Sequence, residues 1–321
     1  MGELGPSDFD ELASAFSLGE FVAFRRIWAG TVNINYRVET TQGTFFLRIN
    51  RGKEEEDVRY EIDVLEYFVA NHVSTPLPKV SQSGLRYYKY LEYYISVFDW
   101  QEGRHVDSKT IVDNDCKMLG AALGQLHSCG SGPQAMLRES RYSDTDLKAR
   151  FGNFSQSLDQ TLTGAISAIE VEMAYLESVQ AGRDSLPRGL IHADLFPDNV
   201  IVQDGRLVLL DFEQACAGHY LYDLAVAVNA WCFSDSFENR RFASLLSSYS
   251  QSAPQPVNLD KLLVELRASA LRFLITRITD VYLLPGVSPT ELQAKDFRRF
   301  LMRLEYWRTV NSHTIAELAQ L

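Results

Sequence analysis

The sequence predicts an α+β protein, with an antiparallel five-stranded sheet plus a helix in its N-terminal part and a mainly helical C-terminal part. Residues 21–98 contain short runs of β-branched and aromatic residues bounded by turn residues, which are typical of strands. Residues 110–321 instead repeat their apolar residues at spacings of three and four, which is typical of helices that bury one face.

A short helix over residues 9–16 is expected to precede the sheet. The five expected strands cover residues 21–28, 36–40, 44–49, 86–90 and 93–98. In the turn between the first two strands, Gly30 would let backbone amides approach a phosphate closely because it has no side chain. Asn33 and Asn35 would add polar contacts there. An ordinary hairpin also contains such a loop, so this loop alone does not decide between the two readings.

A helix is predicted over residues 54–71, because Val58, Ile62 and Leu65 repeat at helical spacing. Two charged residues accompany these apolar segments. Arg48 lies in the middle of the third strand, and Glu61 lies beside the helical stripe. Each is either an ordinary solvated charge or part of a site.

The fifth strand runs into Asp99, where we place the boundary between an N-terminal domain, residues 1–98, and a C-terminal domain, residues 99–321. The C-terminal helices are expected over residues 110–128, 158–179, 222–233, 258–283 and 290–321. His127 in a last helical turn favours a structural role, because a histidine there complements the helix dipole. Asp223 is either a helix N-terminal acid or a buried brace.

Composition narrows the class of protein. The formal net charge of −11 argues against a nucleic acid partner, because phosphate backbones are bound by basic surfaces. The four cysteines show no C-x-x-C spacing, which indicates reduced thiols in a cytoplasmic protein. No stretch approaches the roughly 18 apolar residues of a membrane span, so no membrane association is expected.

Residues 190–212 form the most informative stretch. Residues 200–202 and 207–210 predict a β-hairpin closed by Asp204-Gly205. The polar residues at its two ends are His192, Asp194, Asp198, Asn199 and Asp211. Carboxylate and carboxamide oxygens at one edge suit Mg²⁺, which also takes phosphate oxygens as ligands.

This stretch has the spacing His-x-Asp-x-x-x-x-Asn followed by Asp-Phe-x, and it resembles the catalytic loop and metal-binding element of protein kinases. Ala193 replaces the usual Arg and Glu213 the usual Gly. Both departures resemble the aminoglycoside phosphotransferase and choline kinase group of small-molecule kinases. The resemblance covers nearly the whole chain and implies a protein-kinase-like, two-lobed fold. Residues 191–200, 222–233 and 269–277 resemble the homoserine kinases of this fold.

The resemblance implies ATP and Mg²⁺ as cofactors, with ATP between the lobes. Asn199 and Asp211 would bind Mg²⁺. Asp194 would align, or accept, the hydrogen of the acceptor hydroxyl for in-line attack on the γ-phosphorus. His192 would brace the loop by hydrogen bonding.

For the nucleotide, the resemblance implies that Arg48 holds the α- and β-phosphates and that Glu61 orients Arg48. Whether Arg48 fully replaces the lysine usual at this position stays open. The backbone groups of Val97 and Asp99 would face the adenine edge.

The implied acceptor is L-homoserine, phosphorylated on its side-chain hydroxyl in threonine biosynthesis. A guanidinium holds a carboxylate best. Arg272 and Arg277 point about 140° apart at about 100° per residue, so one of them would serve. Arg272 is favoured, although a structural ion pair would explain it equally well. Glu213 or Asp280 could take the ammonium group.

Two alternatives stay open. The acceptor could be another small hydroxyl compound, such as an aminoglycoside, choline, ethanolamine or methylthioribose, since net charge does not describe a local pocket. The chain could also be a catalytically inactive nucleotide-binding pseudokinase, against which the complete set of Asp194, Asn199 and Asp211 argues. The sequence does not report the oligomeric state.

Overall fold

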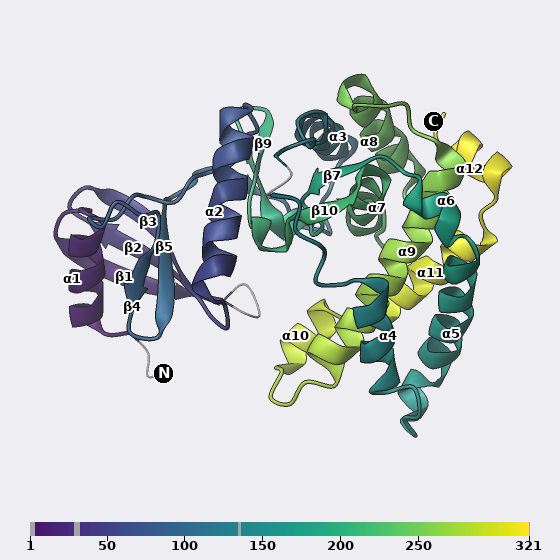
Figure 1. Ribbon diagram of the computed structural model, residues 1–321, viewed down its shortest axis with the longest axis horizontal. Coiled ribbons are helices and arrows are strands. Elements are labelled where there is room, and N and C mark those ends of the chain that lie inside the picture. Colours follow the sequence, from purple (N-terminus) through teal and green to yellow (C-terminus); the bar gives the residue numbers. More distant parts are fainter. Residues whose placement is uncertain (1–3, 29–32, 134–135, 321) are drawn as a thin grey trace. The chain divides into compact units, whose positions relative to one another are not determined.

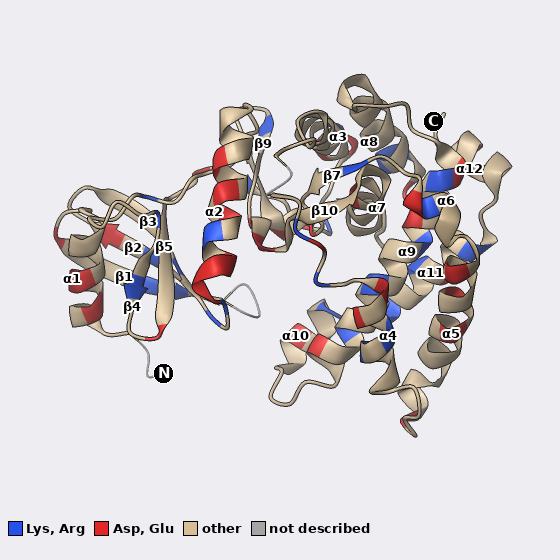
Figure 2. Cartoon of the chain, in the orientation of Figure 1, with Lys and Arg blue, Asp and Glu red and all other residues tan. Residues whose placement is uncertain are grey.

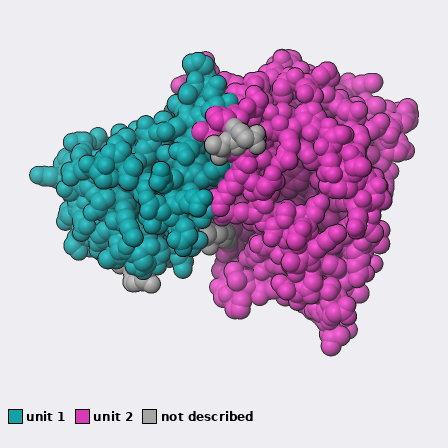
Figure 3. All heavy atoms as spheres, in the orientation of Figure 1, with its two compact units in different colours: residues 1–104, 201–203, 208–213 teal, residues 105–200, 204–207, 214–321 magenta. Residues whose placement is uncertain are grey.

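The computed structural model describes residues 4–28, 33–133 and 136–320. Its chain divides into two compact units (Figure 3). Unit 1 comprises residues 1–104, 201–203 and 208–213, and unit 2 comprises residues 105–200, 204–207 and 214–321. The domain boundary placed after residue 98 stays a prediction.

Unit 1 is built on a five-stranded antiparallel sheet, as the sequence predicts (Figure 1). The spatial order is β1-β2-β3-β5-β4. The strands are β1 (Phe21–Ile27), β2 (Ile34–Thr40), β3 (Gly43–Asn50), β4 (Tyr88–Tyr90) and β5 (Tyr93–Asp99). Helix α1 (Pro6–Ala15) packs on the sheet through Phe9, whose ring stacks on Phe24 with centroids 4.3 Å apart.

Helix α2 (Glu55–Ala70) buries the predicted residues Val58, Ile62 and Leu65. Phe68 is also fully buried, and its ring lies 5.4 Å from that of Phe212. Because Phe212 follows the hairpin in sequence, this contact ties the end of the hairpin to α2.

The predicted hairpin consists of β8 (Val200–Gln203) and β9 (Arg206–Leu209), and β6 (Arg104–His105) completes its three-stranded sheet. Asp204 and Gly205 have φ values of 50° and 73°. Two successive positive φ values are what a two-residue type I′ turn requires, and an Asp-Gly pair adopts them readily. The hairpin prediction is confirmed.

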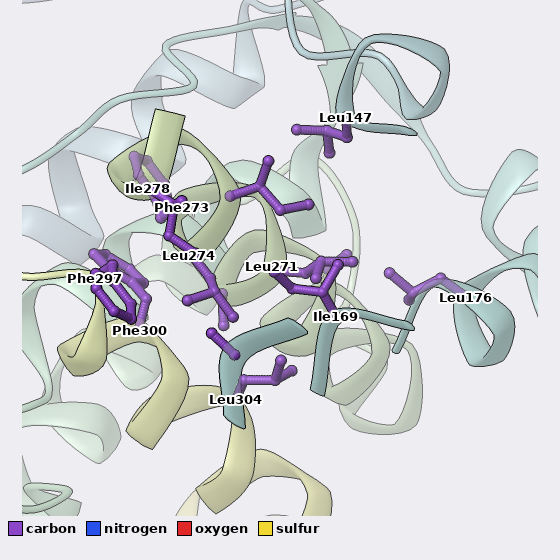
Figure 4. Packing of buried hydrophobic residues seen from close by; sticks show 14 of the residues in the cluster. Leu147, Ile169, Leu176, Leu271, Phe273, Leu274, Ile278, Phe297, Phe300 and Leu304 are labelled. Atoms are coloured by element: carbon purple, nitrogen blue, oxygen red, sulfur yellow. The ribbon is translucent and has the colours of Figure 1, made fainter. Parts of the chain in front are cut away.

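Unit 2 is mainly helical, with a short antiparallel pair of strands, β7 (Arg188–Ile191) and β10 (Cys216–His219). Its helices are α3 (Asp113–Ser128), α4 (Asp144–Gly152), α5 (Thr163–Ser178), α6 (Gln180–Asp184), α7 (Tyr220–Trp231), α8 (Asn239–Ser252), α9 (Leu259–Arg277), α10 (Pro289–Ala294), α11 (Arg298–Thr309) and α12 (Ser312–Leu318). Helix α9 contacts α4, α5, α7, α11 and α12. Its residues Leu271 and Leu274 lie in the core that these helices enclose (Figure 4).

Two predicted helix boundaries in unit 2 are wrong. The helix expected from residue 158 starts at Thr163, because Asp159 caps a 3₁₀ turn over residues 160–162 and Leu158 is exposed. The helix expected to residue 283 is α-helical only to Arg277 and continues as a π-helical turn over residues 278–282. The region after residue 290 is mostly helical, as predicted, and Asn311 separates α12 from α11 by capping α12 with hydrogen bonds accepted from backbone amides.

The helices of the described ranges are all too short or too polar to cross a membrane.

Helices α3 and α8 pack closely because two glycines face the contact. A Cβ atom added at Gly120 would collide with the Leu245 carbonyl oxygen and lie 2.8 Å from the Tyr249 amide nitrogen. One added at Gly124 would lie 3.0 Å from the Tyr249 carbonyl oxygen. Backbone atoms cannot move away as side chains do, so glycine at these positions sets the distance between the helices.

We therefore expect Gly120→Ala to lower the free energy of unfolding by about 1–3 kcal/mol, the usual effect of overpacking. Urea denaturation monitored by circular dichroism measures this change. Gly164→Ala in α5 is the matched control, since a Cβ atom there meets nothing within 4 Å. It should be neutral or stabilising by up to about 1 kcal/mol. Equal stability losses in the two variants would contradict the packing role of Gly120.

Candidate active site

The candidate site residues form two groups, one in each unit. In unit 1, a buried network of charges joins β3, α2 and the segment after β9. Arg48 donates to Glu61 with 2.7 Å between Nη2 and Oε1, the pairing that the family resemblance implies. Lys53 Nζ lies 3.2 Å from Glu61 Oε2 and 2.9 Å from Glu213 Oε2. Arg48 Nη1 also lies 3.4 Å from Asp211 Oδ1. Charged residues of both signs line α2 (Figure 2).

The network compensates for the burial of its members. Arg48, Lys53 and Glu61 are each at most 9% exposed, and a buried charge without a partner is strongly unfavourable. Burial alone would raise the pKa of Glu61, but Arg48 and Lys53 hold that pKa below its usual range. The two cations therefore keep Glu61 ionised.

The pKa values of Asp211 and Glu213, the two acids after the hairpin, are shifted in opposite directions. Burial, with the neighbouring Glu213 carboxylate, raises the pKa of Asp211. Burial acts in the same sense on Glu213, but Lys53 and Arg48 outweigh it and lower the pKa of Glu213. Glu213 is thus the acid that the cations hold ionised, and it also accepts a 2.8 Å hydrogen bond from Asn33 Nδ2.

Sequence reasoning missed Lys53. It lies in the turn before α2, where Gly52 adopts a φ of 64°, and a lone lysine in a charged turn resembles an ordinary surface residue. Its burial depends on Glu213, 160 positions later in the chain, so no local pattern could reveal it.

The remaining nucleotide-binding predictions are placed as follows. Gly30 lies outside the described residues. Asn35 pairs with Arg48 in the register of β2 and β3. The Val97 carbonyl accepts a hydrogen bond from the Lys79 amide, and the Asp99 carboxylate lies 3.2 Å from Lys79 Nζ. These roles toward a nucleotide stay predictions.

Asp211 is held in an uncommon backbone conformation, with a φ of 61°. Aspartate tolerates this left-handed region better than most residues, and such conformations gather at functional sites. The structure around it maintains this geometry, since Phe212 is fully buried and the Leu209 amide donates to the Ser74 carbonyl.

In unit 2, a buried carboxylate fixes the loop after β7. Asp223 of α7 accepts hydrogen bonds from the backbone amides of His192, at 2.9 Å, and Ala193, at 2.7 Å. Ala193 has a φ of 63°, so these two bonds hold a strained conformation. His192 Nδ1 accepts from the Asp194 amide at 3.3 Å. The bracing expected of His192 is present, and Asp223 is a brace rather than only a helix N-terminal acid.

Asp223 is itself held by His127 and Tyr249. His127 Nε2 lies 3.1 Å from Asp223 Oδ2, and His127 Nδ1 lies 2.8 Å from the Tyr249 hydroxyl. Burial would raise the pKa of Asp223, but the bond to His127 contributes to a net lowering. The structural role predicted for His127 is confirmed, although its cause is this hydrogen bonding rather than a helix dipole.

Asp194 keeps 30% of its side chain exposed, and its Oδ1 lies 3.3 Å from Arg272 Nη1. Arg272 is buried, with its guanidinium 4.2 Å from the ring centroid of Tyr142. Asn199 donates from Nδ2 to the Asp194 carbonyl, which directs its Oδ1 away from that bond. Asp194, Asn199 and Arg272 are thus brought together.

The two acids considered for the ammonium group each have an ion-pair partner of their own. Asp280 is 2.5 Å from Arg150 Nη1 on the π-helical turn, and Glu213 belongs to the charge network of unit 1. Their roles toward an acceptor, and that of Arg272, stay predictions.

Asp211 in unit 1 and Asn199 in unit 2 each carry an oxygen donor of the kind that Mg²⁺ prefers, and their role as its ligands stays a prediction. Within the described ranges, no group of three or more His, Cys, Asp or Glu side chains is placed to hold a metal ion. Mg²⁺ at such sites takes only one or two protein oxygens and completes its shell with phosphates and water. Asp211 supplies a carboxylate that is 39% exposed, and Asn199 supplies a carboxamide oxygen.

Comparison with known proteins agrees with this chemistry. Residues 23–255 match the model of the phosphotransferase enzyme family. A homoserine kinase of Parvibaculum lavamentivorans is 30% identical over 97% of this chain and 96% of its own, and one of Methylobacterium radiotolerans is 31% identical over 95% of each.

Among solved structures, an amicoumacin kinase in complex with AMP-PNP and Ca²⁺ has a TM-score of 0.75 at 17% identity, covering 99% of this chain and 97% of its own. A choline kinase of Streptococcus pneumoniae has a TM-score of 0.69 at 16% identity, covering 95% and 99%. The fold is therefore the kinase-like α+β fold, and the chain belongs to the phosphotransferase enzyme family.

Proposed function

We propose that this chain is an ATP- and Mg²⁺-dependent kinase that phosphorylates the side-chain hydroxyl of L-homoserine. The observation that carries the proposal is the loop of His192, Ala193 and Asp194, which Asp223 holds by two backbone hydrogen bonds and which presents a partly exposed carboxylate. The relatives named homoserine kinase, 30–31% identical over at least 95% of each chain, support this acceptor.

Asp194 is the proposed catalytic residue toward the acceptor. A carboxylate held at the acceptor hydroxyl orients a lone pair of the hydroxyl oxygen for in-line attack and can accept the hydroxyl proton. Arg272 holds this carboxylate through the 3.3 Å ion pair, and His192 and Asp223 hold its backbone. Positioning of this kind supplies most of the acceleration in phosphoryl transfer.

Asp211 and Asn199 are the proposed ligands of Mg²⁺. A bound Mg²⁺ neutralises charge on the phosphate oxygens. Arg48 is the proposed phosphate-binding cation, and Glu61 fixes its guanidinium through the 2.7 Å hydrogen bond. Lys53 positions Glu61 and Glu213.

The proposal gives the protein a small-molecule substrate and a cytoplasmic location, and it includes no nucleic acid partner. The net charge of −11 supports the last point, because nucleic acids select basic surfaces.

The first prediction concerns the acceptor. With Mg·ATP, L-homoserine should be the best substrate in a panel that also contains choline, ethanolamine, methylthioribose and an aminoglycoside. A coupled assay of ADP release ranks the acceptors, and mass spectrometry identifies the phosphorylated product. Preference for one of the other acceptors would replace homoserine while leaving the kinase assignment intact. ADP release without any phosphorylated acceptor would contradict both.

The second prediction separates the two aspartates. Asp194→Asn should lower kcat by at least about 10²-fold, because it removes the carboxylate assigned to the hydroxyl, while leaving AMP-PNP affinity within a few-fold. Asp211→Asn should instead weaken Mg²⁺-dependent AMP-PNP binding, because it removes a formal charge facing the metal. Steady-state kinetics and calorimetric titration measure the two effects. Near-normal turnover by Asp194→Asn would remove it from the catalytic role.

The third prediction concerns the ion pair in unit 1. Arg48→Ala and Glu61→Ala should each raise the KM for ATP, and the double variant should raise it by less than the product of the two factors. The reason is that Glu61 acts through Arg48. Multiplicative effects in this double-mutant cycle would show that the residues contribute independently.

A further inference from the structure

Two buried or half-buried arginines of unit 2 have neither an ion pair nor a hydrogen bond within the described ranges. Three of the four buried arginines in the described chain, Arg48, Arg183 and Arg272, form an ion pair with a carboxylate. Arg303, which is 8% exposed, has no ion pair and no hydrogen bond within the described ranges, and its Nε is fully buried. Arg277, half-buried at the end of α9, likewise has neither kind of partner among these residues.

The two arginines lie over one aromatic cluster. Helices α9 and α11 pack against each other, and the Arg303 guanidinium lies 4.5 Å from the Phe300 ring centroid. The Arg277 guanidinium lies 5.8 Å from the ring centroid of Phe196. The rings of Phe196 and Phe300 are 6.3 Å apart, and Phe300 stacks on Phe273 in the core (Figure 4). The two guanidiniums thus cover neighbouring rings of one surface.

The two arginines repel each other, and no ion pair within the described ranges offsets this repulsion. Burial, with Arg299 and Arg277, lowers the pKa of Arg303 to about 9. Burial also lowers the pKa of Arg277, although Asp194 and Asp198 act against it through space without pairing. A partly desolvated guanidinium without an anion is unfavourable, so this arrangement favours a bound anion.

Position identifies the anion. The carboxylate of Asp194, the residue assigned to the acceptor hydroxyl, interacts electrostatically with Arg277. Phe196, whose ring lies under the Arg277 guanidinium, is two residues from Asp194 in the chain. Arg272 is already engaged with Asp194. Two guanidinium groups without ion-pair partners, lying above apolar rings, are suited to bind a carboxylate, because guanidinium groups bind carboxylates through paired hydrogen bonds.

We propose that Arg277 and Arg303 bind the carboxylate of the acceptor and thereby select an amino acid over a simple amino alcohol. The assignment rests on the proposed function, since it takes Asp194 to mark the acceptor hydroxyl. It replaces Arg272 as the carboxylate ligand and leaves Arg272 to position Asp194.

The test compares L-homoserine with L-homoserine amide, which lacks the negative charge. Arg303→Met should raise the KM for homoserine by roughly 10- to 100-fold, the loss expected for a charge-assisted hydrogen bond. It should change the KM for the amide and for ATP by less than about threefold. Arg303→Lys, which keeps the charge but not the fork, should lie between the wild type and Arg303→Met. Arg298→Met, an exposed arginine on the same helix, is the charge-matched control and should leave all three KM values unchanged.

A second measurement does not depend on activity. In the ligand-free protein, Arg303→Met removes an unpaired buried charge, so its thermal midpoint should stay equal to the wild type or rise. Arg183→Met is the matched control, because it leaves the buried Glu265 carboxylate without its partner and should lower the midpoint. If Arg303→Met fails to fold, Arg277→Met, at the more exposed helix end, carries the same kinetic test.

The outcomes separate the two proposals. Homoserine turnover by the wild type, together with a loss in Arg303→Met that is equal for homoserine and its amide, would overturn the carboxylate site and keep the proposed function. A rise in the KM for ATP instead would assign the arginines to a phosphate and overturn the site as well. If the wild type does not phosphorylate homoserine, both the function and this assignment fall.

Discussion

One buried carboxylate fixes the loop that carries Asp194. Asp223 accepts two backbone hydrogen bonds from His192 and Ala193, and it does so while fully buried. Without these bonds Ala193 would have no reason to keep a positive φ, and Asp194 would not project from the loop as it does. The Asp223 carboxylate is in turn held by His127 of α3, so a residue on another helix helps to determine the loop conformation.

The dependence continues outward to helix packing. Tyr249 of α8 reaches His127 because glycines on α3 let the two helices approach closely. The contacts from Gly120 to Tyr249, from Tyr249 to His127 and from His127 to Asp223 all lie among buried residues. A core of this kind transmits a small displacement rather than absorbing it, because close-packed interiors deform little.

Sequence reasoning predicted the parts of the molecule that local patterns determine. The five strands and the Asp-Gly hairpin follow from alternation and turn residues, and the ion pair of Arg48 with Glu61 is the one that the family resemblance implies. Lys53 escaped prediction because its partner Glu213 is distant in the chain. The end of the helix at Arg277 escaped because the π-helical turn after it continues the same apolar spacing.

The buried arginines show why burial and charge alone do not reveal a role. Arg183 of α6 forms a bidentate pair with Glu265 of α9, at 2.8 and 3.1 Å, and this pair is complete without a ligand. Arg303 is buried to the same extent, yet no carboxylate within the described ranges forms an ion pair with it. Selection for stability alone would favour an apolar residue at position 303, because a buried charge without a partner is strongly unfavourable. We expect the Arg303 guanidinium to lower the stability of the ligand-free protein. A bound anion that pairs with the guanidinium would compensate for this loss.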